Sequence, residues 1–60
     1  MKERDKTRIR DCISILKMIR EVISDVNAPL EGRTSHKLTG CCIKVNTIVT
    51  VLETVLQAES

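Results

Sequence analysis

The stretch from residue 38 to residue 56 most constrains what this chain can fold into. Its apolar side chains recur at steps of three and four, which places them along one side of an α-helix. They are Leu38, Cys41, Cys42, Val45, Ile48, Val49, Leu52, Val55 and Leu56. Residues 47–51 (TIVTV) also have the β-branched composition of a strand. Because the repeat holds over the whole stretch, it predicts a helix.

A second periodic stretch precedes the first. Its apolar positions alternate steps of three and four, which is the a/d pattern of a helix that packs on other helices. They are Ile9, Cys12, Leu16, Ile19, Ile23 and Val26. We therefore predict one domain over residues 1–60, with a first helix at about 3–26, a loop at 27–35 and a second helix at about 36–58. Pro29 ends the first helix and Ser35 is the expected N-cap of the second.

The two patterns match in an antiparallel hairpin that sets Val26 beside Leu38. Each layer then pairs an a position with a d position, and the basic start of the chain lies near Glu59. The same register sets Arg20 level with Lys44. The expected layers are Ile23 with Cys41, Ile19 with Val45, Leu16 with Ile48, Cys12 with Leu52, and Ile9 with Val55. The sequence therefore predicts an all-α, antiparallel two-helix hairpin.

A single hairpin of 60 residues buries little apolar surface, and small domains compensate with disulfides, metals or self-association. The three cysteines are an odd number and two are adjacent, which favours reduced thiols and a cytoplasmic protein. We therefore expect a homo-oligomer, by default a dimer that forms a four-helix bundle, or a higher helical oligomer. Its expected core is Leu16, Ile19, Ile23, Val45, Ile48, Val49, Leu52 and Val55.

Composition argues against several function classes. The chain has no aromatic residue and a net charge of +2, so nucleic acid is not an expected partner. Lys44, Asn46 and Glu53 interrupt the most apolar stretch, so we expect no membrane span. One histidine without an aligned nucleophile and carboxylate does not predict an enzyme or a cofactor site. The cysteines have no C-x-x-C spacing, so no metal site is expected.

An anion site is the strongest functional candidate. Residues 32–37 (GRTSHK) lead into a helix start, where free backbone amides and the helix dipole favour negative charge. Arg33 offers a bidentate fork for phosphate or carboxylate, and Arg20 and Lys44 add two cations at one level. The candidate residues are Arg20, Arg33, Thr34, Ser35, His36, Lys37 and Lys44. The structural alternative is that Ser35 caps the helix while the cations extend into water.

These features favour a non-catalytic homo-oligomer that sequesters a small phosphorylated molecule, such as a nucleotide signal, in grooves between protomers. In size and expected architecture the chain resembles small α-helical oligomers that phages use against nucleotide-based immunity. One alternative is an inhibitor or regulator that docks on one host protein through its weakly charged second helix. Another is an RNA-binding hairpin dimer, because the chain is similar in length and expected architecture to plasmid copy-control proteins of the Rop type.

Overall fold

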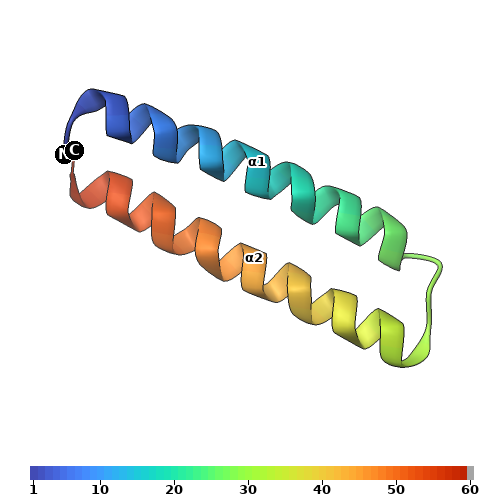
Figure 1. Ribbon diagram of the computed structural model, residues 1–60. Helices are drawn as coiled ribbons and strands as arrows, with labels where there is room; N and C mark the ends of the chain where they lie inside the picture. Colours follow the sequence, from blue (N-terminus) through green and yellow to red (C-terminus); the bar gives the residue numbers. More distant parts are fainter. Residues whose placement is uncertain (60) are drawn as a thin grey trace.

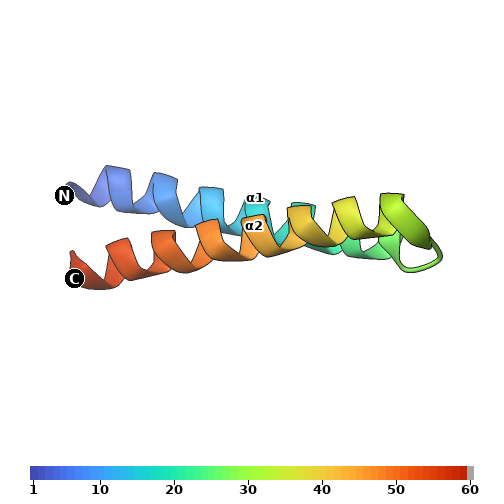
Figure 2. The same cartoon turned by 90° about the horizontal axis from the view of Figure 1, so that it is seen from below.

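Two antiparallel helices make up the described part of the chain, residues 1–59 of the computed structural model. Helix α1 spans Glu3–Asn27 and helix α2 spans Gly32–Ala58. They lie side by side with both termini at one end (Figure 1), and the molecule measures 44 × 15 × 10 Å. Seen from below, the helices cross at a shallow angle (Figure 2). The prediction of an all-α hairpin is confirmed, and residues 47–51 are helical.

The ends of α1 follow the local sequence closely. Glu3 and Asp5 lie in its first turn, where carboxylates suit the positive end of the helix dipole. Its last residue is Asn27, two positions before Pro29, whose ring excludes further helix. The N-terminal ammonium of Met1 lies 3.1 Å from Oε2 of Glu59. This ion pair confirms that the start of the chain lies beside its acidic end.

Helix α2 begins earlier than we predicted. Its first residue is Gly32 and its N-cap position is Glu31, so the predicted loop at 27–35 shortens to residues 28–31. Gly32 has a φ of +74°, a left-handed conformation that glycine adopts without steric cost. The prediction that Ser35 is the N-cap is wrong, because Gly32 turns the chain directly into the helix. Ser35 lies inside α2 and is half-buried.

The contact between the helices uses an inner seam that differs from the predicted one. Its best-buried residues are Ile13 and Val49, which are 8% and 3% exposed. The half-buried residues around them include Ile9, Leu16, Arg20, Ile23, Asn27, Leu38, Cys42, Val45, Leu52 and Val55. On α1 these positions again alternate steps of three and four. Ile13, which the predicted a/d pattern did not include, is therefore part of the seam.

Five predicted layer residues lie outside the inner seam. Ile19 is 43% exposed, Val26 54% and Ile48 48%, and the thiols of Cys12 and Cys41 are also exposed. The predicted layers that contain these residues are therefore wrong for the single chain. The reason is that α1 carries two interleaved seams with the same spacing, and the predicted seam combined residues from both.

Two hydrogen bonds between side chains set the register of the hairpin. The Nη1 of Arg20 donates to Oδ1 of Asn46, and Nδ2 of Asn27 donates to Oγ1 of Thr39 over 3.1 Å. Arg20 is thus level with Asn46 and not with Lys44, which shifts the predicted register by two residues. Because these polar side chains have partners across the contact, they occupy positions that a search for apolar periodicity assigns to solvent.

Candidate functional site

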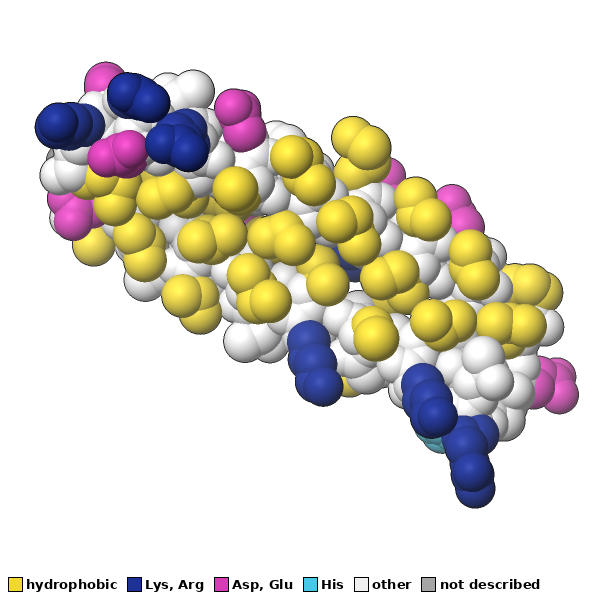
Figure 3. All heavy atoms as spheres, in the orientation of Figure 1, with side chains coloured by type: hydrophobic (Ala, Val, Ile, Leu, Met, Phe, Trp, Pro, Cys, Tyr) yellow, Lys and Arg dark blue, Asp and Glu magenta, His cyan; other side chains and the backbone are white. Residues whose placement is uncertain are grey.

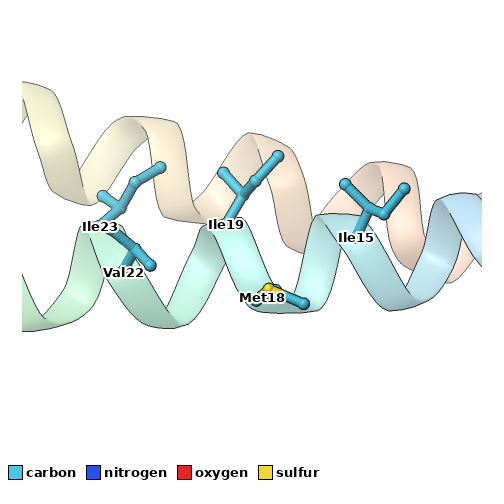
Figure 4. A pocket seen from close by; sticks show the side chains of 5 residues that line it. All are labelled: Ile15, Met18, Ile19, Val22 and Ile23. Atoms are coloured by element: carbon cyan, nitrogen blue, oxygen red, sulfur yellow. The ribbon is translucent and has the colours of Figure 1, made fainter.

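A second apolar stripe runs along α1 outside the inner seam. It alternates steps of four and three, and its four larger members are 43–58% exposed. Ile15, Met18, Ile19, Val22 and Ile23 line an open groove of about 220 Å³ on this helix. Figure 4 shows their side chains. The stripe consists of Cys12, Ile15, Ile19, Val22 and Val26. A helix with two such stripes, one of them uncovered, has an apolar surface left to bury.

Helix α2 carries a matching second stripe. Ile48 and Val51 are 48% and 54% exposed. Its residue numbers increase by four and three in turn from Lys37 to Val55. Two lysines interrupt the first half of this stripe. Its members are Lys37, Cys41, Lys44, Ile48, Val51 and Val55.

Both second stripes lie on the same side of the hairpin. Each is turned by about 100° from the inner seam of its own helix, in the same sense along the chain. Because the helices are antiparallel, an equal turn brings the two stripes to one side. Figure 3 shows hydrophobic side chains gathered over both helices on this side, interrupted by Lys and Arg side chains toward the connector end of α2. We call this side the apolar face; its members are Cys12, Ile15, Ile19, Val22, Val26, Cys41, Ile48 and Val51, with the half-buried Val55 where it meets the inner seam.

On the opposite side of the hairpin, polar side chains join the two helices. Nζ of Lys17 lies 3.8 Å from Oε1 of Glu53, and the Arg20–Asn46 and Asn27–Thr39 hydrogen bonds join the same two helices. By helical periodicity Lys17, Asn46 and Glu53 lie on the side away from the apolar face. The hairpin therefore has one polar side and one apolar side, which the sequence prediction did not separate.

The predicted anion-binding residues fall into two groups. Arg33, Lys37 and Lys44 are exposed, and their spacing of four and seven places them on one stripe of α2. Thr34 and His36 are also exposed in the first turns of α2, whereas Ser35 is half-buried. In Figure 3, Lys and Arg side chains stand along the edge of α2 toward the connector. We call Arg33, Lys37 and Lys44 the basic edge; it lies at one end of the apolar face.

Arg20 does not belong to this basic edge. Its guanidinium donates to Asn46, which lies about 200° around α2 from Lys44, by the helical turn of 100° per residue. The two cations are thus on different sides of α2, and the structure does not bring Arg20 and Lys44 together in one chain. The basic edge consequently consists of residues from α2 alone.

The start of α2 leaves hydrogen-bond donors available beside the basic edge. No side chain caps this end of the helix, and its first backbone amides have no acceptor within the helix. Arg33 and Lys37 are charged donors in the same two turns. This arrangement suits an oxyanion, such as a phosphate or carboxylate, in chemical character. It offers no nucleophile paired with a base.

The remaining surface of α2 is nearly free of charge. The hydroxyls of Thr47, Thr50 and Thr54 donate to the carbonyl oxygens four residues earlier at 2.9–3.0 Å, so these polar groups are satisfied within the helix. By length and composition α2 could cross a membrane, with a mean hydropathy of 1.4 over an 18-residue window. A lipid bilayer is therefore one environment in which this helix has to be tested.

Among residues 1–59, no group of three or more His, Cys, Asp or Glu side chains is placed to hold a metal ion. The three thiols of the described chain are free. Comparison with protein-family models, with curated proteins and with solved structures finds no match. The functional argument therefore depends on the two-sided hairpin and its basic edge.

Proposed function

We propose that this protein is a non-catalytic homo-oligomeric binding protein, in which two hairpins pack through their apolar faces into a four-helix bundle. The observation that carries the proposal is the exposed apolar face on both helices. Water-exposed isoleucine and valine side chains gathered on one side gain free energy when a second apolar surface covers them. A second copy supplies the same surface through a two-fold axis, which is the commonest symmetry of protein oligomers.

The size of the face is adequate for such a dimer. The molecule is 44 Å long and 15 Å wide, so one side has a projected area of about 660 Å². Stable interfaces bury about 800 Å² of accessible surface per partner, and accessible surface exceeds projected area. Four-helix bundles form by covering apolar stripes on facing helices, with helix axes about 8–10 Å apart.

The bundle binds a small anionic ligand, such as a phosphorylated nucleotide signal, at the grooves between protomers. The basic edge supports this part of the proposal, because Arg33, Lys37 and Lys44 lie along the border of the apolar face. His36, Thr34 and the uncapped amides at the start of α2 add neutral donors. Arg20 donates to Asn46 and Ser35 is half-buried, so neither is among the proposed ligand contacts.

Native mass spectrometry of the purified protein tests both parts together. The expected result is a dimer, or a multiple of it, together with any co-purified small molecule. Isothermal titration with inorganic pyrophosphate, ATP and a cyclic dinucleotide then tests the anion site directly. Arg33→Ala and Lys37→Ala should leave folding and oligomer size unchanged and abolish the heat of binding. A monomer at millimolar concentration contradicts the oligomer, and the absence of heat with all three probes contradicts the anion site.

Two other occupants of the apolar face give different results in the same samples. If a host protein docks on the face, the purified protein should be a monomer and a pull-down should recover one protein partner in stoichiometric amount. Anions should not affect this binding. A lipid surface predicts flotation with vesicles of phosphatidylcholine and phosphatidylglycerol. Either result, obtained without a dimer in solution, replaces the proposed function.

A further inference from the structure

We infer that the second copy packs with its connector at the same end of the bundle as the first, so that α1 of each copy lies against α2 of the other. This inference rests on the proposed dimer and specifies its geometry. A two-fold axis that relates two apolar faces can run along the bundle or across it. Only the first direction brings the two connectors to the same end. The charges that border the apolar face distinguish the two arrangements.

The outer border of α1 changes charge along its length. It steps by four and three, so its members form one stripe beside the apolar face. In chain order they are Arg4, Arg8, Asp11, Ile15, Met18, Val22 and Asp25. The border is basic near the termini and apolar in the middle. It is acidic near the connector, where Asp25 is exposed.

The outer border of α2 has a different order of charges. The same stepping selects Arg33, Lys37, Gly40, Lys44, Thr47, Val51, Thr54 and Ala58. This border is basic near the connector and uncharged over the rest of the helix. Glu59 follows Ala58 directly, and its carboxylate lies beside the N-terminal ammonium. Each border therefore has a charged part at the connector, and the two parts have opposite signs.

With the connectors together, the α1 border of one copy faces the α2 border of the other at equal height. The Asn27–Thr39 and Arg20–Asn46 bonds define those heights. At these heights Asp25 of one copy is level with residue 41 on α2 of the other copy. It therefore lies between Lys44, three residues away, and Lys37, four residues away. At the other end, Arg8 comes level with Ala58 and Glu59. Opposite charges thus meet at the connector end of the interface, where Asp25 faces the two lysines, and the apolar middle parts cover each other.

With the connectors apart, each border faces its own copy running in the opposite direction. If the two-fold axis crosses the bundle at the height of Met18, the middle of the apolar part of α1, Asp25 of one copy lies against Asp11 of the other. Two carboxylates at one height repel each other, and Arg8 of the other copy, three residues from that level, offsets this repulsion only in part. On α2 the same operation sets Lys44 opposite Leu52, and the neighbouring Glu53 lies on the polar side of the hairpin beside Lys17. This arrangement therefore covers the same apolar surface with poorer electrostatic complementarity.

The inferred arrangement also locates the anion site. With both connectors at one end, the Arg33, His36 and Lys37 side chains of both copies gather there, while Lys44 is neutralised in part by Asp25 of the partner. The ligand of the proposed function then binds at the connector end of the bundle. Both copies contribute donors to that end.

A distance measurement between spin labels separates the two arrangements. The labels are attached at Leu30→Cys in the connector, in a chain that also carries Cys12→Ser, Cys41→Ser and Cys42→Ala. With connectors together the label-to-label distance is about 15–30 Å, from bundle axes 8–10 Å apart and the reach of the labels. With connectors apart it approaches the 44 Å length of the molecule. A single long distance in a sample that is dimeric overturns this inference and leaves the proposed dimer intact.

Matched charge reversals test the same geometry with the native cysteines in place. Asp25→Lys sets a third cation between two lysines and should weaken dimerisation by about tenfold, the combined effect of a lost and reversed ion pair at the two symmetry-related rim sites. Asp11→Lys is the control, because it faces an uncharged part of α2 and should change the dimer Kd by less than about threefold. If both reversals tighten the dimer, Asp11 and Asp25 face each other and the connectors lie apart. A wild-type chain that is monomeric in both experiments overturns the proposed function as well.

Discussion

Replacing Ile48 by aspartate tests whether the apolar face is an interface. Ile48 lies at the centre of the face and is 48% exposed in the single chain. A carboxylate at this position is therefore hydrated in a lone hairpin and costs little. In the proposed dimer it is buried without a partner, which costs about 3–5 kcal/mol for each buried charge. The two-fold axis creates two such sites, so the dimer should lose about 6 kcal/mol or more, or at least about 10⁴-fold in Kd.

Ile43→Asp is the matched control for this substitution. Ile43 belongs to the same helix and is 61% exposed. It lies about 140° around α2 from Ile48, on the surface away from the apolar face. Sedimentation equilibrium over a hundredfold concentration range measures the Kd, and circular dichroism reports helix content. Ile48→Asp should give a monomer with reduced helicity, and Ile43→Asp should resemble the wild type. Equal behaviour of the two variants would refute the assignment of the face.

Three further predictions test the inner seam and the basic edge. Val49→Ala, at a position 3% exposed, should lower the free energy of unfolding by about 1–3 kcal/mol in urea titrations. Val51→Ala, more than half exposed, should have a smaller effect in protein dilute enough to be monomeric. Arg20→Ala and Asn46→Ala should each cost about 0.5–1.5 kcal/mol, and the double mutant should cost no more than either alone, because the two side chains share one hydrogen bond. Arg33→Ala should reduce the affinity for pyrophosphate without changing the unfolding midpoint, whereas Lys17→Ala, on the polar side, should leave the affinity unchanged.

The helices themselves could be predicted from the sequence because their signals are local. Pro29 stops α1, and the steps of three and four identify both helices without any knowledge of tertiary contacts. The predicted first helix at about 3–26 and the observed Glu3–Asn27 differ by one residue. The start of α2 was less accurate. Ser35 is a good N-cap by residue type, but Gly32 can adopt a positive φ, and this allows the helix to begin three residues before Ser35.

The inner seam could not be predicted from apolar spacing alone. Two seams with equal periodicity run along α1, and the more apolar one faces solvent in the single chain. The seam that contacts α2 contains Arg20 and Asn27, whose hydrogen bonds to Asn46 and Thr39 become visible only in three dimensions. The search for apolar residues at steps of three and four therefore included Ile19 and Val26. These residues belong to the stripe that we assign to contacts with a second copy.

The distribution of polar groups gives a physical reason for two seams in such a short chain. The inner seam holds the hairpin together with few well-buried side chains and two side-chain hydrogen bonds, so it fixes the register but buries little apolar area. The apolar face contains isoleucines and valines without polar partners, so it can add burial but does not by itself select a register. In the proposed bundle, the inner seam orients the two stripes to one side, and the apolar face then supplies the burial that a lone hairpin lacks.

Substituting Arg20 by leucine separates these roles, because it adds apolar area to the inner seam while removing its hydrogen bond. The variant should keep its helix content, and its population of alternative hairpin registers, measured by the number of amide resonances, should rise. A single set of resonances would show that the Arg20–Asn46 bond does not determine the register.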